Sequence, residues 1–181
     1  MQIQNTPIQD LKLIVPKVFQ DQRGYFMESF RKDFIEKSLT IDFVQDNESE
    51  SSKNVLRGLH FQTSPHAQAK LVRVISGAVL DVSVDLRPYS NTFGKHFKTV
   101  LSAENKHQLY IPIGFAHGFA VLEDHTIFSY KCSDYYHPET ELTLLWNDPT
   151  LNIDWGIEKP IISQKDINGK TLQSIIPYLK W

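Results

Sequence analysis

Residues 55–62, Val55-Leu56-Arg57-Gly58-Leu59-His60-Phe61-Gln62, decide how the rest of this chain is interpreted. The stretch is an apolar segment into which a guanidinium and an imidazole are set three residues apart. Gly58 stands between them, where a strand normally carries a side chain. Burying Arg57 or His60 costs free energy unless an anionic or hydrogen-bonding group meets the side chain. The segment therefore predicts a strand that lines a pocket.

Short alternating segments surround this strand on both sides. Along residues 70–75, for example, Lys70, Val72 and Val74 share one face of an extended chain. Further strands are expected at residues 11–19, 25–28, 79–86, 94–101, 108–113, 119–122, 126–131 and 142–146. Many short strands at close spacing favour a β-sandwich or a closed roll.

One segment, residues 28–38, has a helical period. Apolar residues such as Phe34 and Ile35 fall on one side, and charged residues, among them Glu36 and Lys37, fall elsewhere. We expect one short amphipathic helix there.

The segments between the strands are predicted to be turns and loops. Residues 21–24 form a turn, and the polar residues 44–52 (VQDNESESS) form a loop that leads into the pocket strand. Turn signals follow residue 146, and we expect the chain to end in a short packed arm. No repeat or linker divides the sequence, which predicts one domain over residues 1–181.

Composition narrows the class of function. The chain has 19 Lys and Arg against 21 Asp and Glu, a net charge of −2, so no global field attracts nucleic acid. The single cysteine, Cys132, excludes an internal disulfide and predicts a buried thiol in a reducing compartment. The first ten residues do not resemble a signal peptide, and no segment is apolar enough to span a bilayer. We expect a cytoplasmic protein without a nucleic-acid or membrane partner.

The charged side chains near the pocket strand point to acid/base chemistry. His60 is a candidate general base because imidazole titrates near neutral pH. Alternation turns Arg57 and Lys70 inward, and buried cations require an anionic partner such as a ligand carboxylate or phosphate. A strand histidine is also a common packing residue, so the residues alone leave both roles open for His60.

A second motif, Pro112-x-Gly114-x-x-His117, resembles a metal-ligand motif of cupins, a superfamily of small β-barrels. The companion motif would supply two histidines separated by one residue and then a glutamate. Here Gln62 stands two residues after His60, and Lys70 occupies the place of a ligand acid. Since one cation does not bind another, we expect acid/base catalysis without a metal.

As a set, these residues resemble the dTDP-4-dehydrorhamnose 3,5-epimerase family. The resemblance covers residues 13–166 in order and with similar spacing. Besides residues 55–62, it is carried by Phe19-x-Asp21-x-Arg23-Gly24-x-Phe26-x-Glu28, Gln45-Asp46-Asn47, Gln68-x-Lys70-Leu71-Val72, Asp81-Val82-x-Val84-Asp85-x-Arg87, Thr92-Phe93-Gly94, Leu101-Ser102-Ala103-Glu104-Asn105, residues 112–119, Tyr130-Lys131 and Trp146-Asn147-Asp148.

The resemblance implies a mainly β, cupin-type jelly roll with a few short helices, and an isomerase that needs no cofactor. Family members act on a dTDP-linked 4-keto-6-deoxy sugar, which they invert at C3 and C5. The protons on these carbons are acidic because the C4 carbonyl takes up the negative charge as an enolate. A base, a group that stabilises the oxyanion and an acid on the opposite face are therefore required.

Four catalytic roles follow from the resemblance. His60 is the base, Asp166 orients it, Lys70 stabilises the enolate, and Tyr130 returns a proton from the other face. A carboxylate behind a histidine holds one tautomer of the ring. Without the resemblance, Asp166 is predicted to be a turn residue and Tyr130 a core aromatic.

The resemblance also implies a substrate-binding set and a homodimer with shared active sites. Arg23 and Glu28 would reach the dTDP end of the ligand from the neighbouring subunit. The other predicted ligand contacts are Gln45 and Asn47 from a loop, Arg57 and Lys165 on the diphosphate, and His117 and Glu141 in the sugar pocket. The remaining histidines, His66, His96, His107, His125 and His137, are expected at the surface.

Three other functions compete with a 3,5-epimerase. A relative that inverts only C3 or only C5 would use the same base and lysine. A metal-dependent cupin is disfavoured by Gln62 and Lys70, and a catalytically silent sugar-nucleotide binding module is disfavoured by the presence of all four catalytic side chains. The nucleotide is assigned to dTDP by the resemblance alone.

Overall fold

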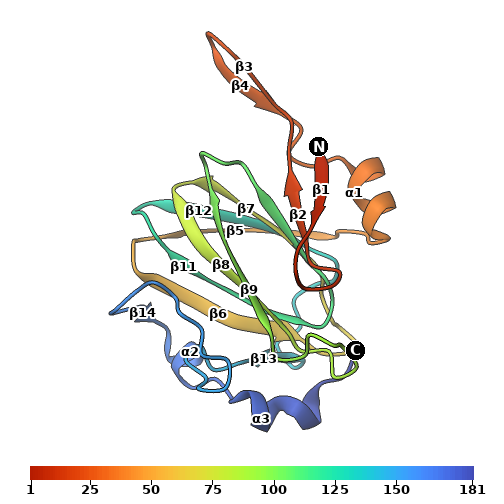
Figure 1. Ribbon diagram of the computed structural model, residues 1–181, viewed down its shortest axis with the longest axis vertical. Coiled ribbons are helices and arrows are strands. Elements are labelled where there is room, and N and C mark those ends of the chain that lie inside the picture. Colours follow the sequence, from red (N-terminus) through yellow and green to blue (C-terminus); the bar gives the residue numbers. More distant parts are fainter.

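The computed structural model describes residues 1–181, apart from the side chains of residues 36 and 37, and consists mainly of two facing β-sheets (Figure 1). Neighbouring strands in the first sheet are antiparallel. In spatial order, the first sheet contains β1 (Gln2–Asn5), β2 (Lys12–Val15), β10 (Gln108–Ile111), β7 (Lys70–Ser76), β12 (Thr126–Cys132) and β5 (Gln45–Ser51).

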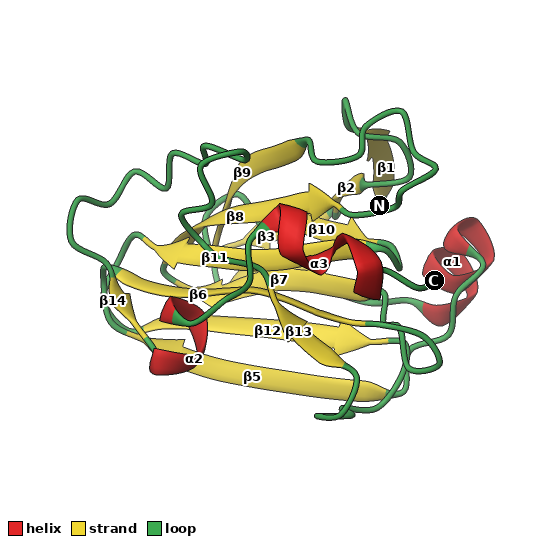
Figure 2. Cartoon of the chain, turned by 90° about the horizontal axis from the view of Figure 1, so that it is seen from below, coloured by secondary structure: helices red, strands yellow, loops and turns green.

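The second sheet lies against the first and contains the pocket strand. Its order is β13 (Glu141–Thr143), β6 (Val55–Gln62), β11 (Phe115–Val121), β8 (Ala78–Asp85) and β9 (His96–Ser102). The short strand β14 (Ile161–Ile162) adds to β6 in a parallel direction. This arrangement confirms the predicted mainly β, cupin-type jelly roll (Figure 2).

The inward faces of the two sheets meet in an apolar core that fills one part of the barrel. Its fully buried members come from both sheets and include Val72, Leu109 and Phe128 from the first and Val79 and Val121 from the second. Burying side chains of this size contributes roughly 1.5–3 kcal/mol each. The apolar core holds the sheets together and leaves the rest of the interior to polar residues.

Terminal segments cover the outer faces of the sheets. The chain after β13 packs against the second sheet, where Leu144, Trp155 and Ile175 join outward side chains of β6 and β8. This segment contains α2 (Gln164–Ile167), α3 (Leu172–Ile175) and the 3₁₀ turn η1 (Ile176–Tyr178). Among the described residues, no helix is long and apolar enough to cross a membrane.

Helix α1 (Lys32–Leu39) confirms the expected amphipathic helix and begins later than the predicted residues 28–38. Ile35 is fully buried, and Phe34 packs with it against the outer face of the first sheet. The expected outward positions of Glu36 and Lys37 lie outside the described side chains.

The prediction of a loop at residues 44–52 was wrong, because residues 45–51 form β5. The strand pairs with β12 over its whole length, from Gln45 opposite Cys132 to Ser51 opposite Thr126. Polar side chains alternate along it in place of apolar ones because its inward face borders a polar cavity. The polar composition of residues 45–51 therefore indicated a loop, although their side chains alternate between two faces as in a strand.

The predicted strand at residues 11–19 is divided into two. Pro16 separates β2 from β3 (Val18–Asp21), which pairs with β4 (Gly24–Met27) as a separate hairpin. The hairpin projects away from the two sheets (Figure 1). It exposes Phe19, Tyr25 and Phe26, the last with 67% of its surface accessible.

Strand β6 presents Arg57 and His60 on the same side of its sheet although three residues separate them. In a regular strand such positions face opposite sides. The pairing between β6 and β11 shifts register between His117 and Phe119. Inward side chains of β6 are therefore odd-numbered before the shift and even-numbered after it, and both charged groups reach the interior.

Gly58 and Gly118 lie at this shift, and their backbones touch. A Cβ atom at Gly118 would lie 2.7 Å from the carbonyl oxygen of Arg57, and one at Gly58 would lie 2.6 Å from the Cα of Gly118. Gly58 also has a φ of +109°, which side chains of L-residues rarely adopt. The pocket strand therefore requires glycine at both positions.

We predict that Gly118→Ala lowers the free energy of unfolding by about 2–3 kcal/mol, because the new methyl group meets backbone atoms that cannot rotate away. Gly156→Ala is the control: nothing lies within 4 Å of its added Cβ, and its positive φ alone should cost about 1 kcal/mol. Urea unfolding of both variants measures the difference. Equal losses would contradict the steric explanation.

Candidate active site

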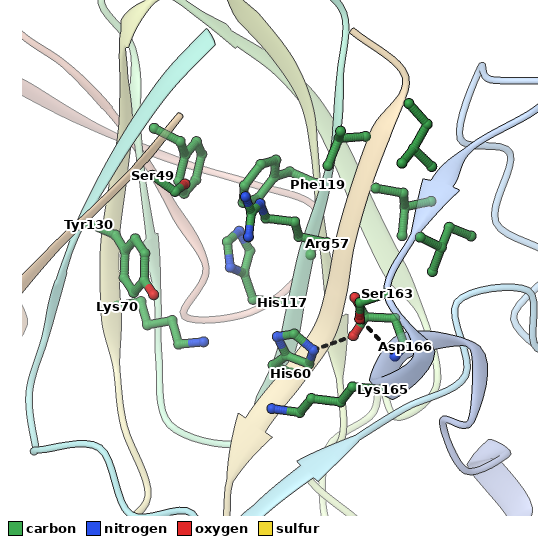
Figure 3. A pocket seen from close by; sticks show the side chains of 16 residues that line it. Ser49, Arg57, His60, Lys70, His117, Phe119, Tyr130, Ser163, Lys165 and Asp166 are labelled. Atoms are coloured by element: carbon green, nitrogen blue, oxygen red, sulfur yellow. Dashed lines mark hydrogen bonds and ion pairs between the residues drawn. The ribbon is translucent and has the colours of Figure 1, made fainter. Parts of the chain in front are cut away.

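A cavity of about 540 Å³ opens between the two sheets beside β6 (Figure 3). Apolar side chains such as Phe119 and Ile162 form part of its wall. Its polar lining comprises Ser49, Arg57, His60, Lys70, His117, Tyr130, Ser163, Lys165 and Asp166. A second lobe of about 360 Å³ shares His60, Lys70 and Tyr130 with the first, so these three residues stand where the two lobes meet.

The centre of the site is a hydrogen bond between His60 on β6 and Asp166 on α2, with 2.5 Å between Nε2 and Oδ1. Asp166 is 2% exposed, and its backbone N–H donates to the hydroxyl of Ser163, which caps the helix. Burial raises the pKa of a carboxyl group, but hydrogen bonds from His60, Ser163 and the backbone N–H of Gly58 hold the pKa of Asp166 below its ordinary value. The charged carboxylate fixes the His60 ring and leaves Nδ1 available to a ligand.

Lys70 begins β7 and carries a cation without a direct counterion. Among the described side chains, its ammonium makes no hydrogen bond or ion pair, and it lies 6.0 Å from the ring centroid of Tyr130. Burial lowers the pKa of Lys70, and nearby carboxylates such as Glu141 oppose that effect in part. An unpaired ammonium inside a cavity is suited to stabilise a developing oxyanion.

Tyr130 lies on β12, in the sheet opposite His60. Burial raises the pKa of its phenol, so the hydroxyl keeps its proton to higher pH than a free phenol does. Because β12 and β6 belong to facing sheets, the phenol and the imidazole approach a ligand between them from opposite sides. A base and an acid on opposite faces are what inversion of a carbon centre requires.

Arg57 stands at the rim of the cavity rather than within it, which corrects the expectation of a buried cation. Its Nε donates to the Ser51 hydroxyl at 3.1 Å and its Nη2 to the carbonyl oxygen of Glu50 at 3.4 Å. Among the described residues, no carboxylate pairs with it. The guanidinium is therefore free to bind an anionic ligand group, for which its planar fork is suited.

The second lobe brings together three predicted ligand contacts, Gln45, Asn47 and Glu141, and Lys165 of the first lobe lies next to Glu141. Gln45 and Asn47 lie on β5, and the amide of Gln45 donates to Asn47 at 3.1 Å. Lys165 on α2 forms an ion pair with Glu141 on β13, with 2.5 Å between Nζ and Oε2. Burial raises the pKa of Glu141, but hydrogen bonds from Lys165 and from the hydroxyl of Tyr136 bring it below the usual range.

His117 on β11 is the direct cross-strand partner of His60. Its Nε2 lies 2.8 Å from Oδ2 of Asp81, a fully buried residue of β8. The ring stacks against Phe128 with centroids 6.0 Å apart. The structure thus places a second histidine–carboxylate pair beside the first.

Arg23 and Glu28 do not line the cavity of this chain. Arg23 lies in the turn of the β3–β4 hairpin, where its side chain is 90% exposed and pairs with Asp21. Glu28 follows β4 and lies 3.9 Å from Arg31. Neither residue is brought near His60 within one subunit.

Gln62, at the position of a cupin metal ligand, joins two loops. Its amide nitrogen donates to the carbonyl oxygens of His66 at 2.6 Å and Tyr135 at 3.1 Å, and its amide oxygen accepts from the backbone N–H of His137 at 2.8 Å. The donor and acceptor groups of this amide are therefore committed to backbone.

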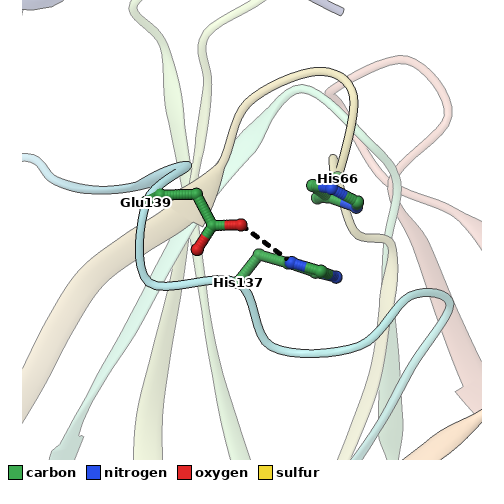
Figure 4. Close-up of side chains that lie close together, drawn as sticks. All are labelled: His66, His137 and Glu139. Atoms are coloured by element: carbon green, nitrogen blue, oxygen red, sulfur yellow. Dashed lines mark hydrogen bonds and ion pairs between the residues drawn. The ribbon is translucent and has the colours of Figure 1, made fainter.

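His66 and His137 lie in these loops and form, with Glu139, the cluster of possible metal ligands shown in Figure 4. The two imidazole rings stack with centroids 3.4 Å apart and planes 10° from parallel. A metal ion lies in the plane of each imidazole that binds it, about 2.0–2.1 Å from nitrogen. Stacked parallel rings cannot share such an ion, so this cluster does not chelate in the conformation described. Both histidines are partly exposed, with 31% of the His66 side chain and 30% of the His137 side chain accessible.

Sequence reasoning missed several residues of the site. Asp81 was noted only as part of a family motif, and Ser49 and Ser51 fell in the wrongly predicted loop. The period of two along residues 45–51 was the signal that could have placed these serines on an inward face. The Ser163-x-x-Asp166 spacing, which is typical of a helix N-terminus, was the signal that could have marked Ser163 as the cap of the helix of Asp166.

Comparisons with known proteins agree with the geometry. The family described as dTDP-4-dehydrorhamnose 3,5-epimerase matches residues 5–174. A protein of that name from Escherichia coli (strain K12) is 51% identical over 179 residues, which cover 97% of both chains. The crystal structure of a Legionella pneumophila 3,5-epimerase in complex with dTDP-4-keto-L-rhamnose is 49% identical, with a TM-score of 0.95 over 99% of this chain and 98% of that chain. A 3′-monoepimerase from Streptomyces bikiniensis in complex with dTDP-quinovose is 32% identical, with a TM-score of 0.90 over 96% of this chain and 89% of that chain.

Proposed function

The chain belongs to the dTDP-4-dehydrorhamnose 3,5-epimerase family, and we propose that it inverts C3 and C5 of dTDP-4-dehydro-6-deoxy-D-glucose to give dTDP-4-dehydro-L-rhamnose. The observation that carries this function is the placement of the His60–Asp166 pair and Tyr130 on opposite walls of one cavity that also holds the ammonium of Lys70. These groups supply a base, an acid and an oxyanion stabiliser, so the reaction requires no cofactor.

The first half-reaction is proton removal. Nδ1 of His60 takes the proton from C3 or C5, and the electrons of the C–H bond move into the ketone to form an enolate. Asp166 stabilises the imidazolium that results. Lys70 stabilises the negative charge on the C4 oxygen. Because this charge is largest in the enolate, the lysine lowers the barrier to enolate formation.

The second half-reaction is proton return from the other side. Tyr130 donates its phenolic proton to the same carbon from the facing sheet, which inverts the centre. The raised pKa of Tyr130 keeps this proton available at neutral pH. Solvent water then takes the proton from His60 and returns one to Tyr130, and a second round at the other carbon flanking the ketone completes the reaction.

The nucleotide end of the ligand requires cations and hydrogen-bonding side chains. Arg57 at the rim and Lys165 on α2 are suited to the diphosphate. Gln45 and Asn47 on β5 offer amides to the ligand, and His117 and Glu141 line the sugar region.

A homodimer with shared active sites supplies the remaining contacts in this proposal. The β3–β4 hairpin carries Arg23, Phe26 and Glu28, and it exposes aromatic side chains away from its own sheets. Isolated two-stranded hairpins are marginally stable in water, so a second copy of the chain that covers it would explain its composition. Residues 1–181 would then act as one epimerase domain. We place the enzyme in the cytoplasm, where the lone thiol of Cys132 stays reduced.

The alternative is an enzyme that inverts a single carbon. The similarity to a 3′-monoepimerase with the same fold favours this candidate over the other competitors. The position of deuterium incorporation separates the two, because each inversion made in deuterated water introduces one solvent-derived hydrogen.

We predict that the protein, incubated with dTDP-4-keto-6-deoxyglucose in deuterated water, introduces deuterium at both C3 and C5, as measured by mass spectrometry and NMR. Label at one carbon alone would overturn the 3,5 assignment. His60→Ala should lower exchange at both carbons at least about 10³-fold, because a positioned general base contributes on the order of 10²–10⁴. His107→Ala, outside the cavity lining, is the matched control and should exchange normally.

We predict that activity declines on the alkaline side through deprotonation of Lys70. Burial lowers the pKa of Lys70 and raises the pKa of Tyr130, so the two shifts bring loss of the lysine charge to lower pH and loss of the phenol proton to higher pH. Lys70→Arg should move the alkaline decline of kcat/KM upward by about one pH unit or more, because arginine stays charged. An unchanged alkaline limb in this variant would exclude Lys70 as its source.

We predict that two inactive variants restore activity when mixed, if each site takes its hairpin from the partner. One variant is His60→Ala, and the other combines Arg23→Ala, Phe26→Ala and Glu28→Ala. After unfolding and refolding together at equal concentration, half of the dimers would be mixed and would hold one complete site, giving about a quarter of normal activity. A mixture as inactive as its components would place the hairpin outside the active site.

A further inference from the structure

The cavity contains two histidine–carboxylate pairs with the same arrangement. His60 and His117 face each other across β6 and β11, and in both pairs Nε2 meets the carboxylate, Asp166 in one and Asp81 in the other. Among the described residues, Nδ1 of neither ring has a partner. The mechanism proposed above uses only the first pair, so the second requires its own explanation.

The two carboxylates approach from different directions. Asp166 comes from the C-terminal segment outside the sheet, whereas Asp81 stands on the inward face of β8, beneath the ring of His117. In Figure 3, His117 stands in the cavity wall with Arg57 and His60 on one side and Lys70 and Tyr130 on the other. Asp81 itself does not line the cavity and reaches a ligand only through His117.

Asp81 lowers the stability of the fold at this position. It is fully buried, and its second oxygen, Oδ1, has no hydrogen-bond partner among the described residues. Ser83, two residues along the same face of β8, is also fully buried with its hydroxyl unpaired. Buried polar atoms without partners each cost about 1–3 kcal/mol of stability. A purely structural role does not account for this cost, whereas a role toward His117, to which Asp81 is hydrogen-bonded, does.

That contact determines which ring nitrogen of His117 carries the proton. A carboxylate is only an acceptor, so the hydrogen bond of 2.8 Å requires the proton of neutral His117 to be on Nε2. Nδ1 then presents a lone pair, which accepts a hydrogen bond from a donor in the cavity. The donors on a 4-keto-6-deoxy sugar are its ring hydroxyl groups.

We propose that Asp81 is a positioning residue that fixes His117 as a hydrogen-bond acceptor for a ring hydroxyl of the sugar. This inference rests on the proposed function and deepens it by assigning how the site selects a hydroxylated sugar. His117 recognises the hydroxyl, while His60, one strand away, acts on the carbon-bound proton.

The first test measures the tautomer of His117 in the wild-type protein by ¹⁵N NMR of the imidazole nitrogens. We expect the neutral ring to carry its proton on Nε2. A neutral ring protonated on Nδ1 would overturn the proposal without any variant, and this result does not depend on catalysis. Absence of exchange in deuterated water would instead refute the proposed epimerase function.

The second test is Asp81→Asn, whose amide can donate to Nε2 and so favour the other tautomer, with Nδ1 protonated. We expect the NMR signature to change accordingly and KM to rise about fivefold, with kcat within about threefold, because one hydrogen bond is lost in ground and transition states alike. Ser83→Ala is the matched control, since it removes the neighbouring buried hydroxyl and should change neither tautomer nor KM. A fall in kcat at unchanged tautomer would overturn the proposal and point to charge support for Lys70.

A third measurement identifies the recognised group. Calorimetry measures the affinity of wild type and of Asp81→Asn for two dTDP-sugars, one without the C2 hydroxyl and one without the C3 hydroxyl. For the analogue that lacks the recognised hydroxyl, the two proteins should bind equally well. A difference that persists with both analogues would overturn the assignment of His117 to a ring hydroxyl.

Discussion

The close approach of Gly58 and Gly118 is the constraint on which the site depends. Only hydrogen atoms fit between these two backbones, and the pairing of β6 with β11 changes register beside them. Before the shift the strand turns Arg57 inward, and after it the strand turns His60 inward. A regular strand would have sent one of the two into the outer apolar cluster beneath the C-terminal segment.

The C-terminal segment completes what the barrel leaves open. Strand β14 joins β6 through Ile162 opposite Leu56, and α2 follows at once with Asp166. Asp148, which is buried, accepts from the backbone N–H groups of Thr150, Leu151 and Leu172, and so ties the start of this segment to α3. The carboxylate that is hydrogen-bonded to His60 thus stands on a covering layer that is itself hydrogen-bonded in place.

The local sequence pattern was enough to predict much of the fold, but it predicted fewer of the residues in the site. Alternation placed Lys70 with Val72 and Val74 on one inward face, and the period of 3.6 located α1 to within a few residues. It failed at β5, because a strand facing a polar cavity has the composition of a loop. Asp166 lies more than a hundred residues from His60, and no local rule connects them; family resemblance alone supplied that pair. The role of Asp81 escaped because its partner, His117, is set by strand pairing, which depends on the whole sheet.

The ion pair between Lys165 and Glu141 has a consequence for the selection of ligands by charge. In the free protein the ammonium is already neutralised by a carboxylate that also holds the hydroxyl of Tyr136. An incoming anion gains Lys165 only by competing with Glu141, and a group bearing one charge competes less well than a diphosphate bearing more. In the proposed function, the pair would therefore favour a diphosphate over singly charged anions at Lys165.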